Sequence, residues 1–439
     1  MSRILFAALV ALALAPAAAQ ARPGDPDTRF GNRGTITLKA VAADAVAGAV
    51  KVLPGNRVLA AGAAGGQFVV VKLRPTGSLD SSFGTSGQVV PILPGSSLDG
   101  VRALATFRDG RIVAAGTLLE ANGEARMVAI RLLPSGEIDP SFGGGLGFVI
   151  AGPDNTELGA MVMDSTGNVI LGGGTFVPGG GQVPVVIRLL PDGTPDPGFA
   201  GGNVVDGSAL GLAGRVTSLL ARSEGTVTFT VGPGPARSGP ATFTTVRLLS
   251  TGAPDPTFGG TGIVQVPLGP GAGAGIGAAA VRRGPSTTTL VAGTDMNASG
   301  TPRGSVIRLR ADGTLDTRFG NRGIVHLARS GRDIRITSMV RDSQGRILLA
   351  GTARAPDSVI VRLRSSGARD RSFGNGGLTY RRVGRPPGGD PIYTTFEAID
   401  AAGPRAILVG SSAGPGRLLR SGSSTIYTGR FALTVSKLL

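Results

Sequence analysis

Seven aspartates recur along the sequence, each three positions after a glycine and three before a phenylalanine, and they are the first residues that could do chemistry. A ring of carboxylates could bind calcium, but a calcium site needs about six or more oxygen ligands. The position before the motif glycine adds a carboxylate only at Asp192 and Asp312. We therefore expect no metal and a structural role, in which each Asp accepts hydrogen bonds from backbone N–H groups of a corner or pairs with a basic residue eight positions earlier. Each Phe would fill the gap between neighbouring units. The motif residues are Asp27 and Phe30, Asp80 and Phe83, Asp139 and Phe142, Asp196 and Phe199, Asp255 and Phe258, Asp316 and Phe319, and Asp370 and Phe373.

Groups for catalysis are scarce. The six glutamates share no repeated motif, so no carboxylate pair of the glycosidase kind can be named. The single histidine, His326, lies in a short apolar run and is expected on the surface of an outer strand. No Gly-x-Ser-x-Gly elbow and no phosphate-binding loop occurs. The sequence thus indicates no catalytic residue and no cofactor, although a site could be assembled from several repeats.

Positive charge is a third signal. Lys and Arg number 44 against 28 Asp and Glu, a formal net charge of +16. Such a surface attracts polyanions, but nucleic-acid binding also needs stacking aromatics, and the chain has three Tyr and no Trp. We expect an anionic polymer of the cell envelope, or another protein, as partner, and no nucleic acid. Arg102, Arg215 and Arg335 could together form a shallow anion site if the repeats close into a ring. The alternative is that they are solvated loop charges.

Residues 1–21 have the features of a secretory signal peptide, with Arg3 near the start, an apolar run over 4–15 and a small-x-small cleavage pattern at 19–21. A membrane anchor is disfavoured because this run is shorter than the roughly 20 residues that a bilayer helix needs. We expect the mature chain to begin at Arg22, to be secreted or associated with the cell envelope, and not to span a membrane. The absence of Cys excludes disulfides and thiolate metal sites.

Short β-strands must position these residues. The repeat that ends at Phe142 has apolar runs at 101–107, 111–116 and 127–133, and a fourth run follows the motif Phe, as at 88–93 in the preceding repeat. Such runs, separated by turn signals, indicate antiparallel β structure, and no helical periodicity follows the signal segment. Four antiparallel strands in a unit of about 57 residues are typical of a β-propeller blade.

The first strand of each repeat is expected to be innermost. Seven positions before the glycine of the turn between the first and second strands, such as Gly110, the residue is small in six repeats of seven. Blades crowd together at the axis of a propeller and leave little room there. These positions are Gly48, Ala103, Ala160, Ser218, Gly277 and Ser338, with Phe396 as the exception.

The ends of the chain predict how the blades close. A lone outer-type strand at 35–39 begins the repeats, and a lone third-type strand at 431–438 ends them. Pairing these two strands would close seven blades over 22–439 into one ring and remove the exposed sheet edges. The alternative is an open β-solenoid with two uncapped ends. We expect the closed seven-bladed ring, an all-β single domain, as a monomer.

The segments LLPSGEIDPSFG (132–143) and RADGTLDTRFG (310–320) resemble the delta-60 repeat family, which consists of tandem repeats in exported or surface-associated bacterial proteins. The resemblance covers essentially all of 22–439; one departure is Ala200, where the other copies have Gly after the motif Phe. The resemblance implies a propeller and an exported protein, and no established activity. The function expected is a non-catalytic binding or scaffold module, and the alternative is a secreted propeller lyase or hydrolase with a site at the channel mouth.

Overall fold

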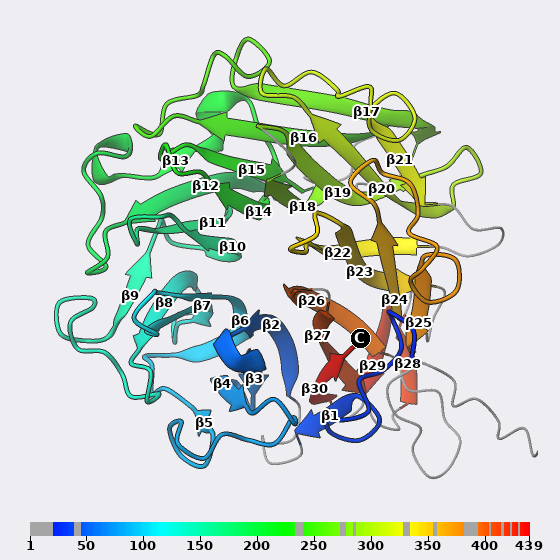
Figure 1. Ribbon diagram of the computed structural model, residues 1–439. Helices are drawn as coiled ribbons and strands as arrows, with labels where there is room; N and C mark the ends of the chain where they lie inside the picture. The colour runs from blue at the N-terminus through cyan, green and yellow to red at the C-terminus, as the bar shows by residue number, and fades with distance from the viewer. Residues whose placement is uncertain are drawn as a thin grey trace, which may run out of the picture.

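Seven four-stranded antiparallel sheets stand around a common centre in the described part of the chain, each radiating outward like a blade (Figure 1). The computed structural model describes residues 21–38, 45–232, 240–272, 278–283, 287–327, 334–353, 358–381, 394–403, 405–413, 417–421, 424–428 and 431–439. The prediction of an all-β propeller with four-stranded antiparallel blades is confirmed. No helix among the described residues is long and apolar enough to cross a membrane.

Each blade carries its strands in chain order from the centre outward, except the last (Figure 1). The innermost strands are β2 (Val46–Val52), β6 (Ser96–Thr106), β10 (Thr156–Met163), β14 (Val216–Ala221), β18 (Ala278–Arg283), β22 (Ile334–Arg341) and β26 (Thr394–Ala402). The second strands are β3 (Val58–Ala64), β7 (Ile112–Leu119), β11 (Val169–Phe176), β15 (Val227–Val231), β19 (Thr289–Met296), β23 (Ile347–Ala353) and β27 (Arg405–Ala413). The third strands are β4 (Gln67–Leu73), β8 (Ala125–Leu132), β12 (Gln182–Leu189), β16 (Pro240–Leu248), β20 (Pro302–Leu309), β24 (Ser358–Leu363) and β30 (Phe431–Lys437). The outer strands are β5 (Gln88–Val89), β9 (Phe148–Ala151), β13 (Val205–Asp206), β17 (Ile263–Ala272), β21 (Ile324–Leu327), β25 (Leu378–Arg381) and β1 (Thr35–Leu38).

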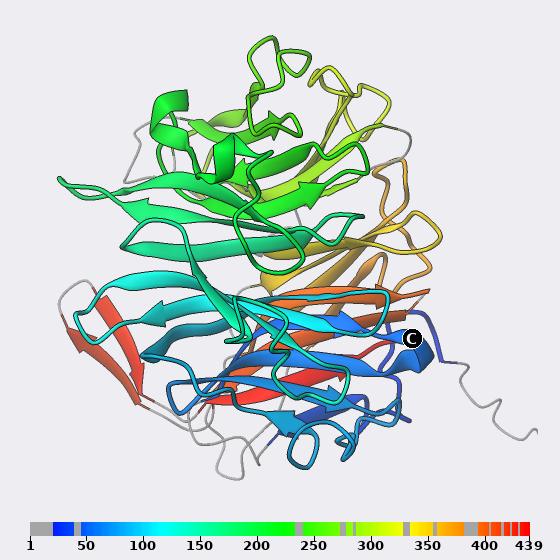
Figure 2. The same cartoon turned by 90° about the vertical axis from the view of Figure 1, so that its left-hand side faces the viewer.

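One outer strand is much shorter than the sequence suggests. The run at 88–93 forms only the two-residue strand β5, because Pro91 cannot donate to a strand ladder. A further hairpin, β28 (Arg417–Ser421) and β29 (Ser424–Thr428), interrupts the last blade between β27 and β30 and stands apart from the blades (Figure 2).

The apolar core lies between neighbouring blades. One cluster joins Val113 and Met127 of the second blade to Val169 and Val185 of the third, all at most 2 % exposed. Each sheet is therefore covered on both sides, and its central strands read as continuous apolar runs. Because this covering comes only from the next blade, a blade cannot bury its faces alone.

A β-bulge interrupts every innermost strand at the same point, and it corrects the register inferred from the sequence. In β26 the pairing slips between Phe396 and Ala398, so the residue equivalent to Ala103 of β6 is Ala398. Phe396 is therefore not an exception, because counting seven positions back from the turn glycine does not reach the residue that follows the bulge. In β2 the residue after the bulge is likewise Ala49 rather than Gly48. Gly277 lies outside the described residues. The residues after the bulge are all small: Ala49, Ala103, Ala160, Ser218, Ala280, Ser338 and Ala398.

The first and last parts of the chain meet in one blade. β1 pairs with β30 in antiparallel register, with Thr35 opposite Ser436 and Leu38 opposite Leu433. The innermost strand of this blade, β26, packs against β22 on one side and β2 on the other. The N–H of Gly374 donates to the carbonyl of Pro23 at 2.8 Å.

Candidate functional site

The blades give the molecule two chemically different faces. An innermost strand and the third strand of its blade run in the same direction, so the turn after the first and the motif corner after the third lie at the same end. The end with the seven motif corners is called the corner face. The opposite end, where innermost strands begin and second strands turn into third strands, is called the variable face.

On the corner face, each motif Asp lies beside the basic residue of its own third strand. The Arg131 Nε lies 2.7 Å from Asp139 Oδ2, and the same contact measures 2.8 Å between Arg362 and Asp370. The equivalent pairs are Arg188–Asp196 at 2.6 Å, Arg247–Asp255 at 2.6 Å, Arg308–Asp316 at 2.7 Å, Lys437–Asp27 at 3.3 Å and Lys72–Asp80 at 4.0 Å. All seven Asp are buried.

Each basic group also lies over the motif Phe of its corner. The Arg131 guanidinium carbon is 4.8 Å from the Phe142 ring centroid, within the range of a cation–π contact. All seven rings are at most 1 % exposed. The structure thus places Asp27, Phe30, Asp80, Phe83, Asp139, Phe142, Asp196, Phe199, Asp255, Phe258, Asp316, Phe319, Asp370 and Phe373 in repeated, buried corners.

The corners connect successive blades. The residue after each motif Phe donates its N–H to the carbonyl just before the motif glycine of the next repeat, as Gly84 does to Ser135 at 2.7 Å. The motif glycine must lack a side chain there, since a β-carbon on Gly136 would lie 2.7 Å from that nitrogen. Arg247 reaches the same segment of the next repeat, where its Nη1 donates to the carbonyl of Ala311 at 2.6 Å.

The carboxylate of Asp139 is held in its ionised form. Burial raises the pKa of Asp139, but hydrogen bonds from Ser141 and Arg131 outweigh it and bring the pKa below the usual 3.8. The carboxylate accepts from the Ser141 hydroxyl at 2.7 Å and from the Ser141 N–H at 3.0 Å. Both of its oxygens are therefore engaged in building the corner, which leaves them unsuited to bind a ligand.

The variable face receives the three arginines predicted to form an anion site, but it separates them. Arg102 occupies the bulge of β6, whereas Arg215 directly precedes β14 and Arg335 is the second residue of β22. β6 and β14 both pack against β10, while β22 belongs to the sixth blade. Arg102 and Arg215 therefore flank a common blade, and Arg335 lies apart from them.

Arg215 shares a polar cluster with the blade that it flanks. Its Nη1 lies 3.5 Å from Oε2 of Glu157, and the same oxygen accepts from Gln182 Nε2 at 3.2 Å. The Arg215 side chain is 36 % exposed and Glu157 is 20 % exposed, so this pair is open to solvent. Glu157 lies two positions before the bulge of β10, which is the position that Arg215 and Arg335 take in their own blades.

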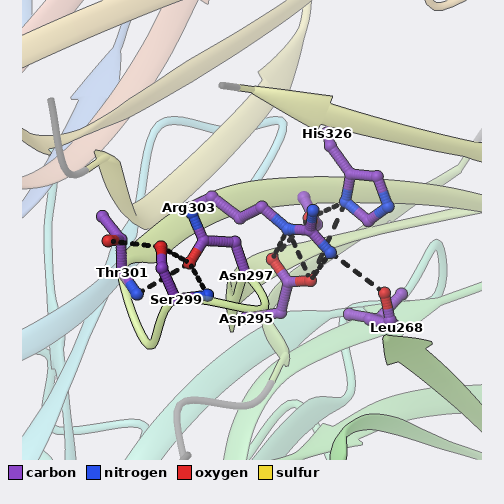
Figure 3. A network of polar contacts seen from close by, with 8 residues as sticks. Leu268, Asp295, Asn297, Ser299, Thr301, Arg303 and His326 are labelled. Atoms are coloured by element: carbon purple, nitrogen blue, oxygen red, sulfur yellow. Dashed lines mark hydrogen bonds and ion pairs between the residues drawn. The ribbon is translucent and has the colours of Figure 1, made fainter. Parts of the chain in front are cut away.

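A second polar cluster, absent from the sequence-based candidates, crosses the variable face of the fifth blade (Figure 3). Asp295 at the end of β19 accepts from Arg303 at the beginning of β20, with Nε to Oδ1 at 3.0 Å and Nη2 to Oδ2 at 2.8 Å. The Ser305 hydroxyl donates to Asp295 Oδ1 at 2.8 Å and lies 2.8 Å from Nδ1 of His326. Arg303 also donates to the carbonyl of Leu268, in the outer strand of the preceding blade.

His326 lies on an outer strand and faces solvent, as the sequence predicts, with its side chain 33 % exposed. Partial burial and the neighbouring Arg303 lower the pKa of His326, against the opposing effect of Asp295. The imidazole is therefore neutral at neutral pH.

The cluster has the residue types of a serine-hydrolase triad but not its order. Ser305 lies between Asp295 and His326, whereas in a triad the histidine lies between the other two. Ser305 and Asp295 are 0 % exposed, so the hydroxyl cannot meet a substrate. Among the described residues, no three His, Asp or Glu side chains gather as metal ligands would.

One sequence signal could have revealed half of this cluster. Asp295 and Arg303 stand on either side of a short turn at cross-strand positions, where opposite charges attract. Ser305 and His326 come together only through the pairing of β20 with β21, and no local pattern predicts that register.

Comparisons with solved structures find similar chains of low identity. They include a GH43_1 enzyme from Xanthomonas citri, at 14% identity and a TM-score of 0.32, covering 64% of this chain and 92% of that one. A glucose dehydrogenase has 13% identity and a TM-score of 0.40, covering 72% and 95%. The extracellular domains 1–2 of Drosophila Semaphorin 1a have 10% identity and a TM-score of 0.41, covering 90% and 86%. These values give no ground for transferring an activity to this chain. No curated protein matches the sequence.

A family profile matches the chain in five segments, 54–83, 108–142, 165–199, 288–319 and 343–373. The family is described as "Domain of unknown function (DUF5122) beta-propeller". Each matched segment ends at a motif Phe, so the profile and the repeat identified from the sequence coincide. Five segments of the chain therefore match the repeats of a β-propeller family.

Proposed function

We propose that this chain is an exported, non-catalytic binding module of the cell envelope or the extracellular space, built as a closed seven-bladed ring, in which the variable face binds an anionic polymer. In this proposal the repeats are members of the delta-60 family and residues 1–21 are removed on export. The polymer contacts arginines that lie in the bulge of an innermost strand, as Arg102 does, or two positions before it, as Arg215 and Arg335 do.

The distribution of charge carries the proposal. Removal of Arg3 with residues 1–21 leaves 43 bases and 28 acids, a net charge of 43 − 28 = +15. The seven corner pairs each contain one base and one acid, so they cancel and leave 36 bases against 21 acids elsewhere. The excess therefore lies entirely outside these seven ion pairs, and it includes Arg335, which is exposed, and Arg215, whose side chain is 36 % exposed.

Contacts between the first and last repeats support ring closure. The β1–β30 pairing and the bond from Gly374 to Pro23 join them at the outer strand and at the corner. At the innermost strands, Oδ2 of Asp400 accepts from the Val52 N–H at 2.9 Å. Deletion of 22–40 should expose two sheet edges and make the protein aggregate. Unchanged solubility and cooperative unfolding after this deletion would contradict a closed ring.

The binding test compares two triple variants that remove the same charge from opposite faces. Arg102/Arg215/Arg335→Ala changes the variable face, and Arg29/Arg318/Arg371→Ala removes three exposed arginines that follow motif aspartates on the corner face. Binding to polygalacturonate is measured by calorimetry at several NaCl concentrations.

We expect the variable-face variant to lose most of the salt-sensitive affinity and the corner-face variant to retain it, because bound arginines release counterions locally. Equal losses in both variants would mean that only net charge matters. Undiminished binding by the variable-face variant would overturn the assignment of the site. Export is tested separately by the mass of the protein recovered outside the cytoplasm, which should correspond to a chain that begins at Arg22.

A further inference from the structure

His326 is the single histidine of the chain, and its hydrogen bonds determine which ring nitrogen carries the proton. A serine hydroxyl has one hydrogen to donate. The hydroxyl of Ser305 donates it to Oδ1 of Asp295, a carboxylate that also accepts from two nitrogens of Arg303. The 2.8 Å contact between Ser305 Oγ and His326 Nδ1 can then exist only if Nδ1–H donates to the hydroxyl.

This chain of donors leaves Nε2 of His326 as an unprotonated acceptor. A neutral imidazole has one N–H and one lone pair, and the N–H is used on the Ser305 side. The ring is 33 % exposed, so the acceptor nitrogen can meet a solute. The lowered pKa of His326 keeps this form populated at neutral pH.

The neighbouring guanidinium offers the complementary group. Arg303 uses Nε and Nη2 to bind Asp295 and Leu268, and within the described residues its Nη1 has no hydrogen-bond partner. Its side chain is 20 % exposed and lies beside the imidazole of His326 (Figure 3). An acceptor and a donor therefore stand next to each other on the variable face, each fixed by a buried partner.

The charge balance determines which ligand suits this pair. Arg303 is neutralised by the bidentate contact with Asp295, and His326 is uncharged, so the pair attracts a simple anion only weakly. A carboxylate or a phosphodiester would also bring no hydrogen for Nε2. Two neighbouring hydroxyl groups fit both positions, since one can donate to Nε2 while the oxygen of the other accepts from Nη1.

We propose that His326 and Arg303 form a carbohydrate contact that binds two adjacent hydroxyl groups of a sugar residue. The contact lies on the same face as Arg335 and is linked to it, because the N–H of Ile336 donates to Oγ1 of Thr294, the neighbour of Asp295, at 3.0 Å. A polymer on the variable face could thus contact Arg335 with its anionic groups and the His326–Arg303 pair with its hydroxyl groups. The sugar contact goes beyond the proposed polymer binding, and an experiment can disprove the sugar contact while the polymer binding stands.

The single histidine makes the test direct, because a nitrogen-detected NMR spectrum of 15N-labelled protein contains one imidazole. The free protein should show the Nδ1–H form. Methyl galactoside, methyl mannoside and methyl glucoside, which present adjacent hydroxyls in cis and trans arrangements, are then added at high millimolar concentration. At least one should shift the Nε2 resonance in the direction of an acceptor that receives a hydrogen bond, whereas poly-L-glutamate should not.

Three variants complete the test. Ser305→Ala removes the hydroxyl that orders the imidazole, and Arg303→Lys keeps the charge but removes the planar fork. Each should lower the affinity for the responding sugar by about tenfold, the effect of one hydrogen bond. Arg102/Arg215/Arg335→Ala should leave the sugar response unchanged. An Nε2–H tautomer in the free protein, or no response to any of the three sugars, would overturn the proposal, and so would a response to poly-L-glutamate alone.

Discussion

The ring of Phe373 packs against Gly24, and this contact joins the last motif of the chain to the first. A β-carbon on Gly24 would lie 3.0 Å from Cε2 of Phe373 and 3.0 Å from the nitrogen of Gly374. Gly77 lies against Phe30 and Gly136 against Phe83 in the same way. The contact that joins the two ends of the chain is therefore the one that joins neighbouring repeats elsewhere.

Gly24→Ala should weaken this junction. The substitution combines the strain of an L-residue at a φ of +96° with a collision against Phe373, whereas Gly123 has a φ of +86° and nothing within 4 Å of its virtual β-carbon. We expect Gly24→Ala to lower the free energy of unfolding by about 1–3 kcal/mol more than Gly123→Ala, which is the usual effect of overpacking. Urea denaturation followed by circular dichroism measures both, and equal losses would mean that the junction does not contribute to stability.

Phe142→Ala tests the filling of the gap between blades. The ring is 0 % exposed, and its removal should lower the free energy of unfolding by about 3–5 kcal/mol, as large-to-small changes in a packed core do. Phe176→Ala is the matched control, because this ring is 48 % exposed and its loss should change stability by less than about 1 kcal/mol. Similar losses in the two variants would contradict the role assigned to the motif.

Asp139→Ala tests the buried ion pair of the same corner. The Arg131 side chain is 2 % exposed, so loss of its partner leaves a buried charge and should cost about 3–5 kcal/mol in unfolding free energy. Asp109→Ala removes an aspartate that pairs with Arg111 at 2.7 Å but is 52 % exposed, and it should cost below about 1 kcal/mol. Thermal melting measures the stability of both variants. Equal losses in the two variants would mean that the buried pair does not stabilise the corner.

The corners could be predicted from the sequence because each is local. Arg131 lies near the end of β8, Asp139 and Phe142 follow in the connection to β9, and seven copies make the spacing visible. The same locality explains why the strand order within a blade could be inferred. The register of the innermost strand could not, because a bulge adds one residue without any change in composition, as the misplaced Phe396 illustrates.

The clusters of the variable face escaped prediction because they occur once. Arg215 meets Glu157 through the packing of two blades, and His326 meets Ser305 through strand pairing, so neither pair has a sequence spacing that repeats. The sequence groups Arg102 with Arg335 because both lie near the start of a first strand, and all such starts are expected to lie around one channel mouth. Arg102 occupies a bulge, and its strand β6 belongs to the second blade whereas β22 belongs to the sixth.

Stability should decrease between neutral pH and pH 5 because of His326. Partial burial and Arg303 lower its pKa in the folded protein, while the opposite pull of Asp295 is smaller. In the unfolded chain the imidazole has its ordinary pKa of 6.5. As the pH falls below that value, the unfolded state therefore binds a proton more readily than the folded state does. The folded state is thus fully favoured above pH 6.5 and loses stability below it, by at most about 1.4 kcal/mol per pH unit for one proton.

His326→Gln isolates this effect, since the chain has no other histidine. The buried carboxylates of Asp139 and Asp370 do not interfere above pH 5, because hydrogen bonds and neighbouring bases hold their pKa values below 3.8 despite burial. Urea midpoints at pH 7.5, 6.5, 5.5 and 5.0 should decrease for the unsubstituted protein and change much less for His326→Gln. If the two pH profiles were parallel, the pKa of the imidazole would be the same in both states, and Arg303 and burial would have no net effect on it.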